Sequence, residues 1–244
     1  AAEDIKRPSS LSTEKEIFSP AEILAMFRAI RYMKTDGIYH GMTNDYFTLL
    51  LFLLTTGMRI GEVLGARWED IRTEGKYRIL HVERTIDPHW YPGKKGQRVS
   101  TPKTESGERD VPLLDRRLLR RLDRLHKANP RTTYIFETSK GNAMEHQNVY
   151  RTWATIGRVV ARECAHCHTR RPTDWTCECD CHMTRNARRC KFCGKARPDS
   201  WICPVCGETV GEIHKTVHTT RHSLASYLNA CDVPLYIIKA VLGH

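Results

Sequence analysis

The sequence predicts an α+β protein that is mainly α with a small antiparallel β-sheet. Three observations lead to this prediction. Apolar residues recur at helical spacing over most of the chain, whereas alternating, partly β-branched segments are confined to residues 77–113. Nine of the ten cysteines lie between Cys164 and Cys206, which marks that stretch as an insert in an otherwise cysteine-poor chain.

The first part of the chain predicts three helices. Residues 1–18 have no sustained periodicity, and we interpret them as a linker or arm. Ser19 is a suitable helix cap and Pro20 a suitable first helical residue, so a helix is expected from there. Residues 44–56 are almost wholly apolar and predict a buried helix that Gly57 ends, and residues 60–66 predict a short helix directly after it.

Strands and further helices follow. We expect strands over residues 77–86, 97–101 and 109–113, with a turn at Ser106 and Gly107. Helices are expected over residues 115–128, 148–162, 219–230 and 235–242. The helix over 115–128 carries five arginines, for which a solvated face is favoured over contact with phosphates.

Composition and charge narrow the class of protein. The chain has 244 residues, 40% of them hydrophobic, which is enough to build a core. Its longest apolar run, residues 47–54, is too short to cross a bilayer, and no secretory signal opens the chain, so we expect a cytoplasmic protein with no membrane partner. The formal net charge of +11 favours a polyanionic partner, above all nucleic acid.

The insert predicts metal sites rather than disulfides, because its cysteines form close pairs in a chain without a secretory signal. It contains two repeats at an offset of 26 residues, in which Cys164–Cys167 aligns with Cys190–Cys193 and Trp175 aligns with Trp201. Both tryptophans are expected to pack within the insert. Cys231, outside the insert, is expected to be a small core residue.

Each repeat predicts one structural zinc held by thiolates, without an open position for substrate. The second repeat supplies two C-x-x-C pairs, Cys190, Cys193, Cys203 and Cys206. The ligands expected from the first repeat are Cys164, Cys167, Cys177 and Cys181. For its fourth ligand four alternatives stay open: Cys179, His166, His168 and His182.

Outside the insert, four separated segments occur in a fixed order: Thr56–Leu64 leading into Trp68–Ile71, Thr101–Thr104 followed by Arg109–Leu113, His218–Ser226, and Leu242–His244. Together they resemble the catalytic domain of tyrosine recombinases, the phage integrase family. The resemblance covers residues 19–244 apart from the insert. It implies a tyrosine-recombinase catalytic fold interrupted by a double zinc-ribbon-like insert.

The resemblance also implies a reaction and its residues. Members of this family attack a DNA phosphodiester with a tyrosine, form a 3′-phosphotyrosyl intermediate and need neither nucleotide nor catalytic metal, so cations must stabilise the phosphate. By resemblance Arg59 and Arg221 hold the phosphate, and Lys103 is the general acid for the 5′-oxygen, with Lys94 and Lys95 as alternatives. His218 and His244 add hydrogen bonds or proton transfer, while Glu62 and His222 are supporting residues.

The chain departs from the family pattern in two ways. The family's tyrosine follows the final Gly-His, and this sequence stops at His244; Tyr227 and Tyr236 come too early and are interpreted as packing residues. We therefore expect a fragment of a longer recombinase that binds double-stranded DNA without cutting it, the full-length parent acting as a homotetramer on DNA. The insert is not a standard part of the family, and DNA contact, protomer contact and loop stabilisation are all possible roles for it, of which DNA contact is preferred.

The expected organisation has four parts: a linker over 1–18, catalytic segments over 19–163 and 210–244, and the metal-binding insert over 164–209 between them. Two other functions stay open, a type IB-like topoisomerase and a non-catalytic zinc-containing DNA-binding protein. A tyrosine beyond His244 in the reading frame would favour an enzyme, and a requirement for paired, specific sites would favour a recombinase.

Overall fold

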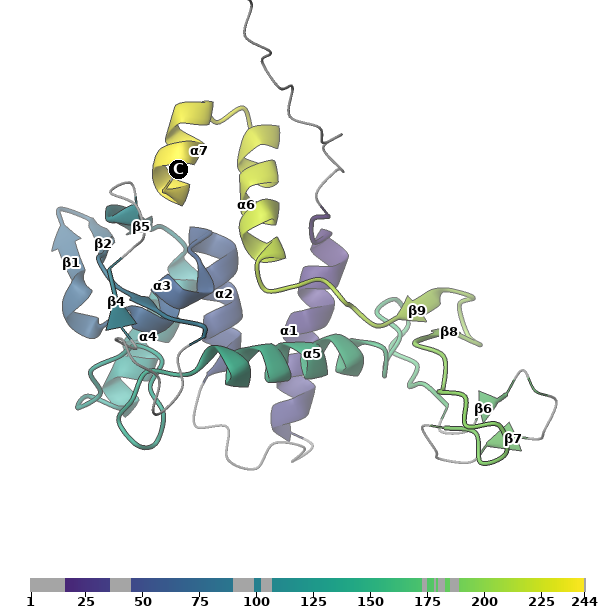
Figure 1. Ribbon diagram of the computed structural model, residues 1–244. Helices are drawn as coiled ribbons and strands as arrows, with labels where there is room; N and C mark the ends of the chain where they lie inside the picture. Colours follow the sequence, from purple (N-terminus) through teal and green to yellow (C-terminus); the bar gives the residue numbers. More distant parts are fainter. Residues whose placement is uncertain are drawn as a thin grey trace, which may run out of the picture.

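The computed structural model describes most of the chain, and Figure 1 shows the arrangement of its elements. The described residues are 16–35, 45–89, 99–101, 107–172, 175–177, 179, 183–184 and 189–243. The expected linker over 1–18 lies outside them except for its last three residues. Within the described part, the protein is mainly helical with small antiparallel sheets, as the sequence predicts.

The helices form the body of the molecule. In chain order they are α1 (Pro20–Thr35), α2 (Tyr46–Thr56), α3 (Ile60–Gly65), the short 3-10 helix η1 (Trp68–Asp70), α4 (Arg116–Ala128), α5 (His146–Val160), α6 (Thr219–Ala230) and α7 (Leu235–Leu242). Two of them, α6 and α7, have the bounds that the sequence predicts. Among the described residues, none of these helices is long and apolar enough to cross a membrane.

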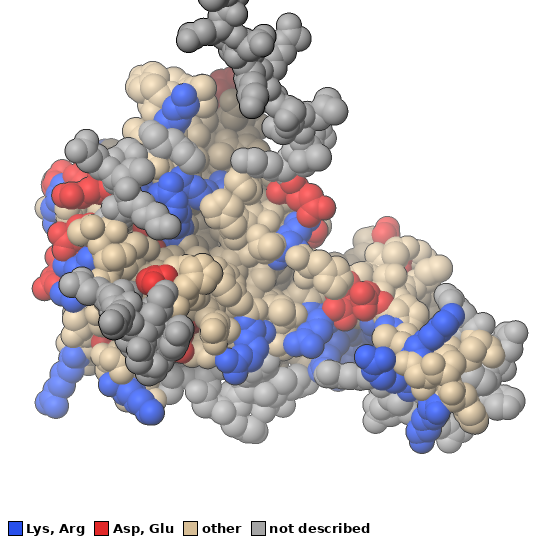
Figure 2. All heavy atoms as spheres, viewed as in Figure 1, with Lys and Arg blue, Asp and Glu red and all other residues tan. Residues whose placement is uncertain are grey.

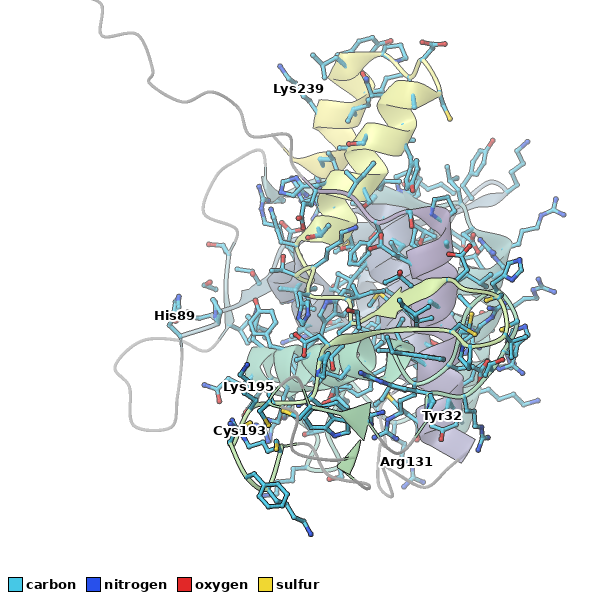
Figure 3. All side chains as sticks on the ribbon, turned by 90° about the vertical axis from the view of Figure 1, so that its right-hand side faces the viewer. Tyr32, His89, Arg131, Cys193, Lys195 and Lys239 are labelled. Atoms are coloured by element: carbon cyan, nitrogen blue, oxygen red, sulfur yellow. The ribbon has the colours of Figure 1, made fainter. Side chains whose placement is uncertain are left out.

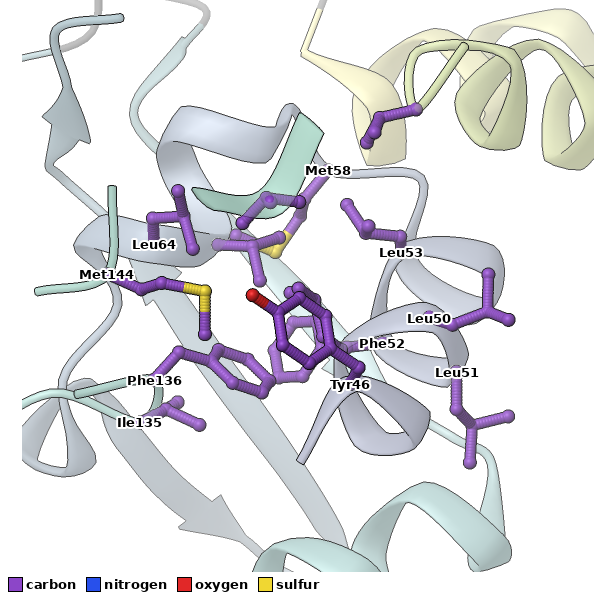
Figure 4. Packing of buried hydrophobic residues seen from close by; sticks show 14 of the residues in the cluster. Tyr46, Leu50, Leu51, Phe52, Leu53, Met58, Leu64, Ile135, Phe136 and Met144 are labelled. Atoms are coloured by element: carbon purple, nitrogen blue, oxygen red, sulfur yellow. The ribbon is translucent and has the colours of Figure 1, made fainter. Parts of the chain in front are cut away.

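Helix α2 is the centre of the core because it is apolar on every side. The Asp45 side chain caps it by accepting from the Thr48 N–H at 3.2 Å. Leu50, Phe52 and Leu53 are at most 2% exposed, and Figure 4 shows them packed with aromatic and sulfur-containing side chains from other elements. The helix ends at Gly57, which has a left-handed φ of 62°.

The main sheet has three antiparallel strands in the order β1 (Ile71–Glu74), β2 (Tyr77–Val82) and β5 (Arg109–Leu113). A separate pair joins β3 (Thr85–Ile86) to β4 (Val99–Ser100). The prediction of one strand over 77–86 is therefore wrong, and strand β1 is not among the predicted strands. The chain leaves the first sheet at Glu83 and Arg84, where the Arg84 guanidinium donates two hydrogen bonds to the buried Asp70 carboxylate.

The insert leaves the body after α5 and forms an arm, at the lower right of Figure 1. It carries two small hairpins, β6 (Trp175–Thr176) with β7 (Met183–Thr184), and β8 (Ser200–Ile202) with β9 (Thr209–Gly211). Trp201 packs at the base of the arm and donates its indole N–H to the Ala161 carbonyl at 2.7 Å. The division of the chain into four parts stays a prediction.

The segment that returns from the arm to α6 is fixed against α1 and α5. The Trp153 indole N–H donates to the Lys215 carbonyl at 2.8 Å, and the Lys215 ammonium donates to the Glu22 carboxylate at 2.7 Å. Gly157 lets this segment come close, since a Cβ built there would lie 2.1 Å from the Ile213 carbonyl oxygen. These contacts set the position from which α6 begins.

Two expectations for the C-terminal helices are wrong. Cys231 is exposed, because it follows the last residue of α6 at the end of the α6–α7 pair. Tyr236 is 73% exposed on α7 rather than packed. Tyr227, by contrast, is partly buried and donates its hydroxyl to the Phe18 carbonyl.

Candidate active site and metal centre

A polar cluster lies where the start of α3, strand β5, the first turn of α6 and the C-terminal end of α7 meet. Arg59 immediately precedes α3 and occupies its N-cap position. Its N–H donates to Glu62 Oε2 at 2.9 Å, and its Nη1 donates to Glu62 Oε1 at 2.9 Å. Gly57, two residues earlier, forms a left-handed turn that leads the chain to Arg59. Only glycine suits this turn, because a Cβ at Gly57 would lie 2.6 Å from Leu242 on α7. Local chain geometry therefore fixes where Arg59 points.

Glu62 is the anion of this cluster and is only 2% exposed. It accepts from two nitrogens of Arg109, at 2.9 and 3.3 Å, in addition to the bonds from Arg59. Burial opposes ionisation of this carboxyl, but the hydrogen bonds and charge of Arg109 outweigh it and lower the pKa of Glu62 below its ordinary value. Glu62 is thus a charged residue that orients two arginines.

Arg221, on the first turn of α6, is 3% exposed. It donates to the Gly57 carbonyl at 2.9 Å and to the Leu242 carbonyl. Burial, together with the neighbouring positive charges of Arg59 and Arg109, lowers the pKa of Arg221 to about 10. The guanidinium is still charged at neutral pH, and a bound anion would relieve the repulsion among the three arginines.

The three arginines also meet at the end of α7. Three consecutive carbonyls there each accept from a different guanidinium: Val241 from Arg109 at 2.9 Å, Leu242 from Arg221, and Gly243 from Arg59 at 3.3 Å. A helix C-terminus carries partial negative charge, which suits this role. The end of α7 is therefore part of the site. In Figure 2, Lys and Arg side chains gather in the hollow beneath α7.

The two predicted histidines of the third motif lie beside this cluster. His218 is the exposed N-cap residue of α6, and its ring stands 4.7 Å from that of the half-buried His222, in edge-to-face orientation. A cavity of about 720 Å³ lies next to His218, between α5 and the returning segment. Lys103, Lys94, Lys95 and His244 lie outside the described residues.

Arg109 is a site residue that sequence reasoning does not identify. Its segment, Arg109–Leu113, belongs to the second motif, yet the sequence analysis assigns no role to the arginine. The sequence does contain a feature that could have identified it: an arginine at the start of a strand, facing inward, needs a buried acidic residue as its partner. Its side chain is 7% exposed, so its pairing with Glu62 is a buried one.

The arm contains two groups of four cysteine sulfurs, and each group could hold a metal ion once all four sulfurs are thiolates. One consists of Cys164, Cys167, Cys203 and Cys206; the other consists of Cys177, Cys179, Cys190 and Cys193. The expected grouping within each repeat is wrong, because each group takes two cysteines from each repeat. Cys179 occupies the position for which Cys181 is expected, and Cys181 and His182 lie outside the described residues. Neither His166 nor His168 belongs to these groups, and His168 contacts Glu163 instead.

The reason for this grouping is that the repeats face each other with approximate twofold symmetry. Arg171 donates to the Pro198 carbonyl at 2.6 Å, and Arg197, which is 26 residues further on, donates to the Pro172 carbonyl. The tight turns are equivalent too: the Cys164 N–H donates to Thr169 and the Cys190 N–H to Lys195. Each repeat thus completes the other's thiol group, as in a self-complementary dimer.

The thiol spacing fits tetrahedral zinc. Sulfurs about 2.3 Å from a zinc ion lie about 3.8 Å from one another. In the first group the Sγ atoms of Cys164 and Cys206 are 3.5 Å apart, and those of Cys167 and Cys203 are 3.3 Å apart. In the second group the Cys177–Cys193 distance is 3.5 Å and the Cys179–Cys190 distance is 3.8 Å. Backbone N–H groups of Cys193 and Phe192 lower the pKa of the Cys190 thiol, which favours the thiolate that a metal needs.

Sequence comparison supports the family resemblance directly. Residues 17–176 match the phage integrase family. This match covers more than half of the chain. The chain belongs to the phage integrase family. A protein described as a tyrosine recombinase XerC-like, from Caldanaerobacter subterraneus subsp. tengcongensis, is 28% identical over 164 residues, which is 60% of this chain and 39% of that protein.

Solved structures share the fold of this phage integrase family member. The Tn1549 transposon integrase, in complex with transposon right end DNA, matches 97% of this chain and 60% of its own length with a TM-score of 0.61 and 16% identity. The XerH site-specific recombinase bound to difH substrate matches 94% of this chain and 47% of its own length, with a TM-score of 0.52 and 16% identity. The present chain thus spans about two fifths to three fifths of the length of these relatives.

Proposed function

We propose that this chain is the greater part of the catalytic domain of a site-specific DNA recombinase that cuts and rejoins strands through a 3′-phosphotyrosyl intermediate. The observation that carries the proposal is the convergence of Arg59, Arg109 and Arg221 on Glu62 and the end of α7. A cluster with three guanidinium groups and one carboxylate has surplus positive charge, and it suits a phosphodiester.

The proposed roles follow from accessibility. The Arg59 side chain is 39% exposed and can reach a phosphate from solvent, while the buried Arg221 would stabilise the negative charge that develops in the transition state. His218, exposed at the start of α6, is placed to donate a hydrogen bond or pass a proton. Lys103 would protonate the leaving 5′-oxygen. His244, which follows the Gly243 bonded to Arg59, would complete the site.

The nucleophile in this proposal is a tyrosine of the longer protein. The tyrosine hydroxyl gives its proton to His218, the proposed acceptor, as its oxygen bonds to phosphorus. The bond between phosphorus and the 5′-oxygen breaks in the same step, and the leaving oxygen takes a proton from the general acid. A second 5′-hydroxyl reverses these steps and restores the tyrosine. The proposed partner is double-stranded DNA, and the proposed assembly on DNA is a homotetramer. The DNA in the structures of the Tn1549 integrase and XerH supports the choice of partner.

The proposed cofactors are two structural zinc ions, one in each thiol group of the arm. Zinc would cross-link the two repeats and stabilise a segment whose buried cluster, among the described residues, consists of Cys164, Cys203 and Val210. It would take no part in the chemistry, since each ion already has four sulfur ligands and no open position.

The reaction is tested in the longer protein that carries the tyrosine, with a nicked suicide substrate that traps the covalent adduct. Arg59→Ala should abolish the adduct while DNA binding persists. Arg78→Ala, on the face of β2 that pairs with Asp123, is the matched control and should leave the adduct yield unchanged. An equal adduct yield for Arg59→Ala would contradict the role of Arg59.

The fourth zinc ligand is tested by a pair of neighbouring cysteines. Cys179→Ser should lower the zinc content of the purified chain from two ions to one, measured by elemental analysis, because Cys179 lies in the thiol group of Cys177, Cys190 and Cys193. Cys181→Ser should retain two. The reverse pattern would assign the ligand to Cys181.

A further inference from the structure

The outer turn of the arm combines positive charge with an exposed aromatic ring. Residues 182–198 contain six Lys and Arg residues and no Asp or Glu. Within the described part of this stretch, residues 191–196 are all exposed, and Phe192 between Lys191 and Cys193 is 75% exposed. The turn thus places one aromatic ring among positive charges, a combination that suits contact with nucleic acid.

The turn is held rigidly by the chain around it. The Cys190 N–H donates to the Lys195 carbonyl at 2.8 Å, and the Gly194 N–H donates to the Cys190 carbonyl at 3.0 Å. Gly194 has a φ of 74°, which a glycine adopts without strain, and Arg189 donates to the Gly194 carbonyl at 3.1 Å. Phe192 is therefore presented outward on a fixed support, so little conformational entropy is lost when it binds.

The other C-x-x-C turns of the arm do not share this chemistry. The turn over Cys203–Cys206 has Pro204 and Val205 in its middle and is followed by the acidic Glu208. The turn over Cys164–Cys167 lies against the body, where the Ala165 carbonyl accepts from Arg28 of α1 at 3.0 Å. Symmetry of the thiol groups alone thus does not explain the basic and aromatic turn at 190–195.

This turn lies on the same side of the molecule as the chain that leads to the Lys103 segment. In Figure 3, Cys193 and Lys195 lie on the left, as does His89, which follows β3; Arg131 lies further to the right. Strand β3 pairs with β4, which leads directly to the Lys103 segment. Figure 2, viewed from that left-hand side of Figure 3, shows Lys and Arg side chains on the arm and beneath α7. One long polyanion could therefore contact both regions.

We propose that the turn over Arg189–Lys195 is a second DNA-contact surface, which binds duplex DNA beside the segment held by the catalytic cluster. Lys191 and Lys195 contact backbone phosphates, and Phe192 makes an apolar contact in the groove between them. This proposal rests on the proposed function, because it assumes that the body of the protein binds the same DNA. A protein partner is the competing occupant, and the positive charge without any acidic residue favours DNA.

The test measures binding of the zinc-loaded chain to a fluorescein-labelled mixed-sequence duplex over a range of salt concentrations. Lys191→Ala with Lys195→Ala should reduce the slope of log affinity against log salt by about 2, close to one unit for each phosphate that is no longer neutralised. Phe192→Ala should weaken binding by roughly fivefold, because part of the apolar area that Phe192 buries in the groove is lost, and leave the slope unchanged.

Two matched variants serve as controls. Val205→Ala truncates the corresponding apolar residue of another turn, and Arg131→Ala removes an exposed charge that Figure 3 places away from the arm tip. Both should bind like the unchanged protein. Zinc content must stay at two ions in every variant, which separates weaker DNA binding by a folded arm from unfolding of the arm.

The outcomes are separable. If the unchanged chain binds the duplex and the tip variants bind it equally well with the same salt slope, the arm proposal is wrong while the proposed function stands. Loss of self-association with unchanged DNA binding would assign the tip to a protein partner and also overturn the proposal. Absence of DNA binding by the unchanged chain would overturn both.

Discussion

The arginine cluster of Arg59, Arg109 and Arg221 and the cysteine-rich arm position charged groups by opposite means. In the body, Arg59, Arg109 and Arg221 are held by a carboxylate and by backbone carbonyls above a large apolar core. The arm has almost no apolar core of its own within its described residues, and its basic tip rests on thiol groups and tight turns. Where apolar area is scarce, cross-links must replace burial.

The two regions also differ in how sequence distance relates to contact. The residues of the arginine cluster come from segments up to 184 positions apart, as in the contact of Arg59 with Gly243. The arm is built from adjacent repeats, yet its thiol groups join the outermost pairs to each other and the innermost pairs to each other. In the arm, therefore, closeness along the sequence is a poorer guide to which residues contact one another than it is in the body.

Removal of metal gives the largest expected effect and tests the contrast between the regions. A structural zinc contributes on the order of 10–16 kcal/mol of apparent binding free energy in small metal-dependent folds. A strong chelator should therefore abolish hydrogen-exchange protection over the described residues of 164–211, while α2 stays protected. Full protection of the metal-free arm would show that its fold does not depend on metal.

Paired cysteine variants test the nested grouping. Cys164→Ser with Cys203→Ser removes two ligands of one group and should leave one zinc ion, whereas Cys164→Ser with Cys177→Ser damages both groups and should leave none. If the ligands were instead grouped within each repeat, the first double variant would leave no zinc and the second would leave one ion. Elemental analysis of the purified variants distinguishes the two arrangements.

Loss of Arg109 tests the body. Arg109→Ala leaves the Glu62 charge buried without its bidentate partner, and breaking a buried pair in this way costs about 3–5 kcal/mol. Denaturant unfolding should show this loss. Arg78→Ala, which breaks the exposed pair with Asp123, should leave the free energy of unfolding nearly unchanged. Equal effects of the two variants would mean that Glu62 does not depend on Arg109.

A glycine variant tests the junction between the two regions. Gly157→Ala places a Cβ 2.1 Å from the Ile213 carbonyl oxygen and must displace the segment that leads to His218. The overpacking should cost about 1–3 kcal/mol, partly offset by the better helix propensity of alanine. Gly211→Ala, whose Cβ would have an ordinary contact at 3.7 Å, is the control for thermal unfolding.

The smallest effect concerns pH. Because the pKa of Glu62 is lower in the folded protein than in the unfolded chain, its charge stabilises the fold above the ordinary glutamate pKa. This stabilisation is lost as the pH falls through the lower, folded value. Glu62→Gln should therefore show a weaker loss of stability between neutral and acidic pH in urea unfolding. An identical pH dependence in the variant would contradict the ionised state of Glu62.

Much of the fold is predictable because its signals are local. The apolar run of α2, the Asp45 cap and the Gly57 stop are all visible within a dozen residues, and so are the bounds of α6 and α7. The break between β2 and β3 is not predictable, since it depends on Arg84 turning towards Asp70. The exposure of Tyr236 escapes prediction for a similar reason: helical spacing does not say what covers a helix.

The sequence by itself determined the class of the protein, the helices, the order of the four motifs and the identity of Arg59, Glu62, His218 and Arg221 as site candidates. Only the tertiary structure decided which partners these residues take, including the part played by Arg109, and which cysteines share a group. The physical reason is that helix formation and residue chemistry are local properties. Buried charge pairing and tetrahedral thiol grouping depend on the distance between elements after folding, which spacing along the chain does not set.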